Sequence, residues 1–455
     1  MNVVIPLGGI GSRFQKEGYL KPKPFVRVLG KEMILWVTEN LTLGRDDLLV
    51  VVYNPTFMDM KESMELVTES VGANCVLVEL AGPTRGAAET VKFGLLGLDA
   101  NRRKRPCLLV DGDTFYTADV VGLYRSVSER GAGATFVFHD TQPKPIYSYV
   151  SAKKLEEEED FEEHDAENNK TSSAAVGSSF AVGGIREKVK ISDWANTGCY
   201  CFPDGEILLD YCEAIISRGE TQLSQDQKGE FYTSGVIKAM LDDSFPFEAI
   251  VLDKADMHVL GTPSQLTAFC RAKQPEALRV CFDLDNTLFT SPKVQGDYST
   301  CEPIERTVAM LKALYDNGHY VILATARRMR THKANVGAVV ADVGAVTLET
   351  LQKAKVPYHE IHFGKPWAQF YVDDKAVNAF TDLEKELGYY LPLDNKALPS
   401  KFYTNGLLSK SPSSASIAQK TDTTPTTTER ENTTTTTEHE NTTTTTEHEN
   451  TTTTT

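Results

Sequence analysis

Two aspartates, Asp283 and Asp285, follow directly on the apolar run Val280–Phe282. Two carboxylates at the carboxyl end of a buried strand are unfavourable unless they bind a metal ion or take part in catalysis. By itself, a DxDxT pattern also fits a calcium-binding turn or a helix cap. Later features favour catalysis: a second apolar run that ends in a threonine, a lysine between glycine and proline, and a third apolar run that ends in two aspartates. These residues are Thr325, Lys365, Asp373 and Asp374.

A second group of residues suited to chemistry lies near the start of the chain. The glycine-rich loop Gly8–Gly11 follows the apolar run Val3–Leu7, and Arg13 comes shortly after it. Glycines at the carboxyl end of a strand let backbone N–H groups approach a phosphate, and the start of the next helix adds a favourable dipole. The alternative is an ordinary glycine-rich turn. The nearby segment Lys21–Pro24 favours phosphate binding, because it brings a second cationic group beside Arg13.

Short apolar runs alternate with amphipathic segments along most of the chain. Strands are expected at Val3–Leu7, Leu48–Val52, Val76–Glu79, Cys107–Asp111 and Ala134–Phe138, with helices at Met33–Leu43 and Glu89–Leu98. The pattern starts again with strands at Arg279–Asp283, Tyr320–Thr325 and Gln369–Asp373 and a helix at Ile304–Asn317. Buried strands separated by helices predict an α/β fold with two doubly wound, Rossmann-like domains.

Two stretches lack this pattern. Residues 151–180 are first acidic and then rich in small polar residues, which predicts a surface loop insertion. From residue 409 the composition collapses into Ser, Thr and Pro and then into a Thr/Glu/His/Asn repeat that offers no apolar face. We therefore expect a first domain at 1–265, a second at 278–405 and a disordered tail at 409–455.

The charge of the chain is concentrated in the same stretches. Of the formal net charge of −16, residues 155–169 carry −9 and residues 411–455 carry −5, so the rest is close to neutral. A general nucleic-acid binder needs a basic surface, which is missing. No apolar run approaches the roughly 20 residues that span a bilayer, and no secretory signal pattern is recognisable. With eight cysteines of the kind found in reduced proteins, the chain is expected to be cytoplasmic, without nucleic-acid or membrane partners.

The first half of the chain resembles the sugar-nucleotide-forming nucleotidyltransferases, which include glucose-1-phosphate thymidylyl- and uridylyltransferases and phosphocholine cytidylyltransferases. The similarity covers roughly residues 1–265 and begins with VVIPLGGIGSRF and KPKPFVRVLGKEMILWV. Further segments follow in the family's order. They are the base-binding loop Leu80–Ala88, the strand Leu108–Asp113, the pair Glu187-Lys188, the substrate loop Asn196–Gly198 and the closing Gly261–Pro263.

This resemblance implies transfer of a nucleoside monophosphate, with roles for particular residues. Arg13 and Lys23 would hold the triphosphate, Lys188 the acceptor phosphate, and Asp113 a Mg²⁺ ion. Asp111 is a second candidate for the metal, since strand alternation points it the same way. The residues expected to bind nucleotide and substrate are Leu7, Gly8, Gly9, Gly11, Ser12, Gly86, Ala87, Glu187, Lys188, Asn196, Thr197 and Gly198. Because both reactants are anionic, catalysis would rest on charge neutralisation and alignment.

One position departs from the family pattern. Many relatives have a second metal-binding aspartate two residues before the glycine of the closing motif, and this chain has Val259 there. Asp253 or Asp256 could take its place, or Asp113 could serve alone. The number of metal ions in this site is therefore left open.

The second half resembles the haloacid-dehalogenase-like phosphohydrolases, with all four motifs across roughly residues 279–390. The run CFDLDNTL, GHYVILATARRMRT and GKPWAQFYVDDKAV is similar to a subgroup associated with capsule biosynthesis. The resemblance implies that Asp283 attacks phosphorus to form an aspartyl-phosphate, while Asp285 protonates the leaving oxygen and later activates water. Thr325 and Lys365 would hold the phosphoryl oxygens.

The same resemblance implies a magnesium site and an open pocket. The metal ligands are expected among Asp283, Asp285, Asp373 and Asp374. Only about 40 residues separate Asp283 from Thr325, too few for a large cap domain. The cluster Arg327-Arg328-Arg330 fits two alternatives equally well, a site for an anionic substrate group and a solvated helix face.

Taken together, these patterns predict a bifunctional enzyme of nucleotide-sugar or polysaccharide precursor synthesis. It would transfer a nucleoside monophosphate from an NTP to a sugar 1-phosphate and hydrolyse a phosphomonoester. One alternative is a cytidylyltransferase for phosphocholine or a phosphonate with an accessory phosphatase. Another is a catalytically degenerate fusion that acts as a binding protein. The expected partners are small phosphorylated molecules, and homo-oligomer formation is left open.

Overall fold

The computed structural model describes residues 1–55, 60–71, 74–153, 177–223, 229–273, 277–373 and 375–390. Most of the expected acidic insertion, Asp374 and the expected disordered tail lie outside these ranges. The expected end of the second domain at residue 405 also lies outside them. The predictions made for those parts of the chain therefore stay predictions.

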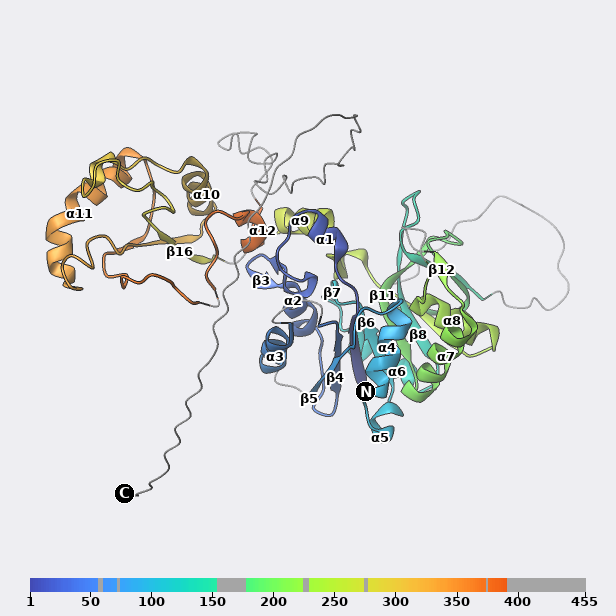
Figure 1. Ribbon diagram of the computed structural model, residues 1–455. Helices are drawn as coiled ribbons and strands as arrows, with labels where there is room; N and C mark the ends of the chain where they lie inside the picture. The colour runs from blue at the N-terminus through green and yellow to red at the C-terminus, as the bar shows by residue number, and fades with distance from the viewer. Residues whose placement is uncertain are drawn as a thin grey trace, which may run out of the picture. The chain divides into compact units, whose positions relative to one another are not determined.

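A nine-stranded sheet organises the first part of the chain (Figure 1). The strand order is β5-β4-β1-β6-β11-β8-β14-β10-β9. The first four strands are parallel, namely β5 (Asn74–Glu79), β4 (Leu48–Tyr53), β1 (Asn2–Leu7) and β6 (Cys107–Val110). The others are β11 (Trp194–Phe202), β8 (Gly133–His139), β14 (Phe247–Val251), β10 (Ser179–Glu187) and β9 (Ser148–Ala152). The α/β class is confirmed, and the sheet is mixed because β11 runs antiparallel to both β6 and β8.

Helices cover both faces of this sheet, so its central strands are apolar on both sides. In β1, Val3 and Ile5 pack into one core and Val4 into the other. The first core also takes in side chains from α2 (Met33–Glu39), α3 (Met60–Val71), α6 (Val120–Ser128) and α9 (Pro263–Ala272). The second takes in α4 (Ala87–Leu96), α7 (Gly205–Arg218) and α8 (Thr233–Asp242). Burial on both faces explains why the strands read as continuous apolar runs.

Further short elements complete this domain. They are α1 (Ser12–Lys16), η1 (Lys23–Phe25), β2 (Arg27–Val28), β3 (Lys31–Glu32), α5 (Ala100–Arg103), β7 (Thr114–Tyr116), β12 (Gln222–Leu223), β13 (Gly229–Glu230), η2 (Lys254–Asp256) and β15 (Met257–Val259). β7 and β15 pair antiparallel, with Val259 opposite Thr114. The paired strands lie next to the end of β6, where the expected carboxylates Asp111 and Asp113 are located.

The second part of the chain contains a smaller parallel sheet with the order β16-β17-β18. Its strands are β16 (Arg279–Asp283), β17 (Tyr320–Ala324) and β18 (Glu360–His362), accompanied by η3 (Tyr298–Thr300), α10 (Glu305–Asp316), α11 (Val336–Lys353) and α12 (Leu383–Leu387). Apolar residues from β16, β17 and α10 form one core. No helix within the described ranges is long and apolar enough to cross a membrane.

The strand expected at Gln369–Asp373 is wrong in this structure, because those residues form no strand and the third strand is β18 instead. Phe370 is 85% exposed and Val372 is fully exposed. A strand needs a neighbour that accepts and donates its hydrogen bonds. Among the described residues β16 pairs with β17 alone, so its other edge does not take up this segment.

Candidate functional site

The glycine loop after β1 lies close to two other segments. A Cβ atom at Gly8 would lie 2.2 Å from the Thr90 hydroxyl oxygen, in the first turn of α4. Gly11 has a φ of 65°, which favours glycine, and a Cβ there would lie 3.0 Å from the Cβ of Lys23. The glycines therefore let the loop approach both α4 and the segment that carries Lys23. Leu7 lies behind the loop, against Gly112.

Two carboxylates stand directly beyond the end of β6. Lys23 forms an ion pair with Asp113. Burial by itself would raise the pKa of Asp113, but Lys23, the Thr114 hydroxyl and Arg13 together lower it. Burial and the neighbouring charge of Asp113 raise the pKa of Asp111 to about 8. The raised pKa means that the charge of Asp111 is not fully compensated by the surrounding groups. A cation bound between Asp111 and Asp113 would compensate it.

Gly198 leaves room for these carboxylates. It has a φ of 89°, and a Cβ there would lie 2.4 Å from an oxygen of Asp111. Its carbonyl oxygen accepts a hydrogen bond of 3.1 Å from the backbone N–H of Asp111. The other two residues of the expected substrate loop, Asn196 and Thr197, are buried. Asn196 accepts a hydrogen bond of 2.7 Å from the Gly198 N–H, and Tyr116 donates one of 2.8 Å to the Thr197 carbonyl.

These contacts show how the loop is shaped. The buried side chains of Asn196 and Thr197 support the turn at Gly198, and their expected contact with substrate stays a prediction. The base-binding segment is shaped in a similar way. Gly86 has a φ of 147°, a Cβ there would lie 2.5 Å from the Phe231 carbonyl oxygen, and α4 begins at Ala87.

Lys188 and Glu187 lie at the end of β10. The Lys188 ammonium donates a hydrogen bond of 2.9 Å to the Tyr232 hydroxyl and lies 3.5 Å from Glu187. Ser234 donates a hydrogen bond of 2.9 Å to Glu187, whose pKa is raised by burial. Burial also raises the pKa of Tyr232, and Arg13 opposes that rise. Arg13 therefore acts electrostatically on both sides of the site, through Asp113 and through Tyr232.

The alternatives proposed for the missing second aspartate both accept local hydrogen bonds. Asp253 caps η2 by accepting a hydrogen bond of 2.9 Å from the Ala255 N–H, and Asp256 accepts one of 2.9 Å from the Thr117 hydroxyl. Both are thus engaged in local structure. Val259 lies opposite Thr114, the residue that follows Asp113. The oxygen donors for a cation here are Asp111 and Asp113, which is a suitable set for Mg²⁺ completed by water and phosphate.

In the second domain, Asp283 lies at the end of β16 and Lys365 in the loop after β18. The Lys365 ammonium lies 3.1 Å from Asp283, whose other oxygen accepts a hydrogen bond of 2.9 Å from the Leu284 N–H. Thr325 follows β17, is fully buried, and accepts a hydrogen bond of 3.1 Å from the Arg327 N–H. All four expected catalytic residues of this domain thus lie at or just after the carboxyl ends of the three parallel strands.

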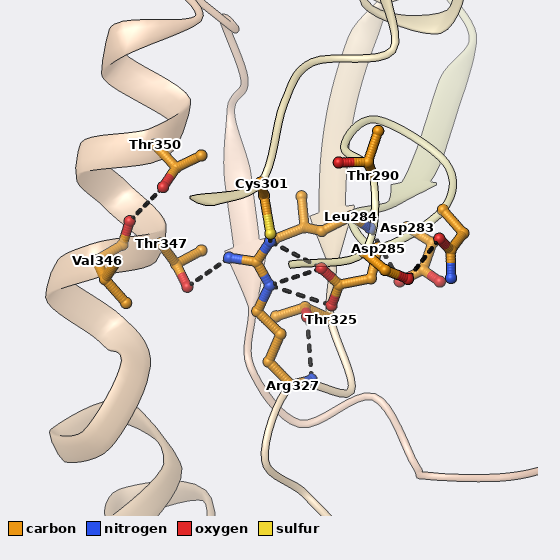
Figure 2. A network of polar contacts seen from close by, with 12 residues as sticks. Asp283, Leu284, Asp285, Thr290, Cys301, Thr325, Arg327, Val346, Thr347 and Thr350 are labelled. Atoms are coloured by element: carbon orange, nitrogen blue, oxygen red, sulfur yellow. Dashed lines mark hydrogen bonds and ion pairs between the residues drawn. The ribbon is translucent and has the colours of Figure 1, made fainter. Parts of the chain in front are cut away.

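Arg327 is the residue that the sequence argument misjudged. Figure 2 shows its side chain between Asp285 and Thr347 of α11. It donates hydrogen bonds of 2.8 to 3.1 Å to both oxygens of Asp285 and one of 3.0 Å to the Thr347 hydroxyl. Its side chain is fully buried. Neither alternative was right for Arg327, since it holds Asp285 in place and residues 327–334 form turns where a helix face was expected.

Of the expected magnesium ligands of this domain, Asp373 lies in an exposed turn and Asp374 is outside the described residues. Asp373 accepts a hydrogen bond of 2.7 Å from the Lys375 N–H. Within the described ranges, no group of three or more His, Cys, Asp or Glu side chains is arranged to hold a metal. Asp283 and Asp285 are suitable oxygen donors, but both are occupied by cationic side chains. The donor set fits Mg²⁺ only in part.

Asp283 and Asp285 open into a pocket of about 650 Å³. Its wall also includes Lys293, Arg328, Arg330 and Trp367, so it is lined by more basic than acidic groups. Neither Trp367 nor Lys293 was among the expected site residues. Motif spacing does not predict that these two residues line the pocket, because they lie in separate loops that come together only in the folded domain.

The chain belongs to the nucleotidyl transferase family, whose model matches residues 2–242. Residues 280–451 match the haloacid dehalogenase-like hydrolase model. The fused two-domain organisation predicted from the motifs is therefore confirmed, and the chain combines a nucleotidyltransferase domain with a hydrolase domain. No curated protein matches the chain.

Solved structures similar to the chain come from several bacteria. A nucleoside-diphosphate-sugar pyrophosphorylase from Vibrio cholerae RC9 is 23% identical, with a TM-score of 0.45, over 59% of this chain and 98% of its own. An inositol-1-phosphate CTP transferase from T. maritima is 14% identical, with a TM-score of 0.41, over 58% and 90%. Another Vibrio cholerae protein is 34% identical, with a TM-score of 0.23, over 24% and 96%.

Proposed function

We propose that this chain is a bifunctional enzyme. Its first domain transfers a nucleoside monophosphate from an NTP to a sugar 1-phosphate, and its second hydrolyses a phosphomonoester. The observation that carries the proposal is that each domain has a carboxylate paired with a lysine at the carboxyl end of a parallel strand. These pairs are Lys23–Asp113 and Lys365–Asp283. Such an edge is where ligands bind in open α/β sheets.

In the transfer reaction, an oxygen of the acceptor phosphate attacks the α-phosphorus of the NTP. The bond from that phosphorus to the oxygen bridging to the β-phosphate breaks, and pyrophosphate leaves. Arg13 and Lys23 hold the triphosphate and balance its charge, while Lys188 holds the acceptor phosphate. Asp111 and Asp113 are the residues that would bind Mg²⁺, which supplies further neutralisation of phosphate charge.

In the hydrolytic reaction, an oxygen of Asp283 attacks phosphorus and the bond to the leaving alcohol breaks. The leaving oxygen takes a proton from Asp285, and an aspartyl-phosphate remains. Water then attacks that phosphorus, gives a proton back to Asp285, and releases phosphate with the Asp283 carboxylate restored. Lys365 and Thr325 hold the phosphoryl oxygens, and Arg327 keeps Asp285 in position. Because the metal ligands are incomplete here, no step is assigned to Mg²⁺.

The proposal places the enzyme in the cytoplasm, in the synthesis of nucleotide sugars or polysaccharide precursors. Pyrophosphate release would be measured from CTP, UTP, GTP, ATP and dTTP with Mg²⁺. Each NTP would be paired with hexose 1-phosphates, phosphocholine or 2-aminoethylphosphonate. The expected result is turnover with one base and a hexose 1-phosphate. If CTP reacted only with phosphocholine or the phosphonate, that compound and not a sugar 1-phosphate would be the acceptor. If no combination released pyrophosphate, the proposal of nucleotidyl transfer would be contradicted.

A further inference from the structure

Among the described residues, the pocket that contains Asp283 and Asp285 has one cation without an acidic group within 4 Å. Arg327 is paired with Asp285, Arg328 lies 3.4 Å from Asp342, and Lys293 forms an ion pair with Glu302. Arg330 is exposed and has no acidic partner within 4 Å in the part of the chain that the structure describes. An unbalanced cation in a pocket is a binding element for an anion.

Arg330 is also held in place by an aromatic ring. Its guanidinium group lies 4.9 Å from the ring centroid of Trp367, which itself is 46% exposed and lines the same pocket. Stacking uses the flat face of a guanidinium and leaves its N–H edge able to donate to a carboxylate or phosphate. The arrangement lowers the entropy lost when Arg330 binds an anion, because the side chain is already ordered.

The backbone beneath Arg330 is fixed as well. Met329 is buried against Val339 and Val343 of α11, and its carbonyl accepts a hydrogen bond of 2.9 Å from the Ala334 N–H. Arg328 adopts a left-handed backbone conformation with a φ of 58° and donates a hydrogen bond of 3.1 Å to the Gly296 carbonyl. Arg330 therefore projects from a well-packed turn, which is how a specificity residue is usually supported.

We propose that Arg330 and Trp367 form a second anion subsite, so that the preferred substrate of the hydrolase domain carries another anionic group besides the phosphate that is removed. This inference rests on the proposed phosphatase function. The substrate class is a small phosphomonoester with a second phosphate or a carboxylate. One phosphate lies at Asp283 and Lys365, and the other anion lies at Arg330.

The test compares three probes on the full-length protein: glucose 6-phosphate, 6-phosphogluconate and glucose 1,6-bisphosphate. Wild type is expected to prefer at least one of the two doubly anionic probes through a lower KM. In Arg330→Gln that preference should fall about 10- to 100-fold, the range for loss of a charged hydrogen bond. Arg279→Gln is the matched control, because Arg279 stacks on Tyr320 at 4.2 Å but lies outside the pocket lining.

A preference that is absent in wild type, or equal in wild type and Arg330→Gln, would overturn the subsite. The two doubly anionic probes then separate phosphate from carboxylate recognition. Binding of the same probes to Asp283→Asn, measured by calorimetry, decides the matter independently of turnover. If wild type hydrolysed no phosphomonoester, the phosphatase proposal would fail. The subsite would still stand or fall on whether Arg330→Gln in the Asp283→Asn background weakens binding of a doubly anionic probe.

Discussion

The two candidate sites have a similar arrangement of carboxylates and a lysine, but the negative charge of the carboxylates is balanced differently in each. In each, carboxylates lie at the carboxyl end of a parallel strand, and a lysine from another segment pairs with one of them. In the first site the second carboxylate, Asp111, forms no ion pair within the described ranges, and its pKa is raised to about 8 by burial and by Asp113. In the second site the corresponding Asp285 is held by the buried Arg327. The first is therefore suited to recruiting a cation, and the second to orienting a carboxylate.

The largest effect is expected at the first site, on removing the charge of Asp113. Asp113→Asn leaves Lys23 without its partner and removes a proposed metal ligand. Pyrophosphate release should fall about 10²- to 10³-fold, the usual loss when one group that stabilises the transition state is removed. Asp256→Asn is the matched control, since Asp256 bonds to Thr117, and should stay within about twofold. Equal losses in both variants would mean that Asp113 has no special role.

Whether Arg327 orients Asp285 can be tested by removing the charge of Arg327. Arg327→Met leaves Asp285 without its partner and should destabilise the second domain by about 3 kcal/mol, as for other broken buried ion pairs. Asp285→Asn in the same chain should restore part of this loss, because the unpaired charge is gone. Thermal unfolding of the single and double variants measures the coupling. Strictly additive losses would show that the two side chains do not act as a pair.

The cation-recruiting role of the first site can be sharpened at Val259. Val259→Asp adds a carboxylate opposite Thr114, beside Asp113. We expect the Mg²⁺ concentration for half-maximal pyrophosphate release to fall about tenfold, because affinity rises with the number of charged ligands. Val259→Asn has a similar size without the charge and should not produce this shift. An unchanged Mg²⁺ dependence in Val259→Asp would argue that no metal ion binds beside Thr114.

The smallest effect concerns the stability of the second domain against pH. Burial lowers the pKa of His319, whose Nδ1 accepts a hydrogen bond of 3.1 Å from the Leu278 N–H. The unfolded chain then takes up a proton more readily than the folded one, so stability should decrease as the pH falls below about 6.5. The slope is at most about 1.4 kcal/mol per pH unit. His319→Gln should flatten this dependence in unfolding curves between pH 5.5 and 7.5, and an unaltered slope would assign it to other groups.

The strands of both sheets were predictable where burial requires a continuous run of apolar residues. β16 has the predicted bounds Arg279–Asp283, and β1 differs from its prediction by one residue. The antiparallel course of β11 was not predictable, since apolar runs carry no information on strand direction. The segment Gln369–Asp373 has the apolar pattern of a strand, but pairing depends on a neighbouring edge that the local sequence does not reveal.

In the candidate sites, too, some residues could be predicted from the sequence and others could not. Asp113, Asp283 and Lys365 could be found because motif spacing and strand ends locate them. Arg327 could not, because three neighbouring arginines look alike in sequence and only the packing of α11 decides which one is buried. The burial of Asn196 and Thr197 was not predictable for a related reason, since a loop motif does not tell which of its side chains face inward.

If two independent sites act in one chain, one activity can be lost while the other remains. The most direct test is to measure pyrophosphate release and phosphomonoester hydrolysis in the same preparation of full-length Asp283→Asn. Hydrolysis is expected to fall at least about 10³-fold, as on loss of a nucleophile, while pyrophosphate release stays within about twofold of wild type. Loss of both activities together in a protein that remains folded would contradict the independence of the two sites.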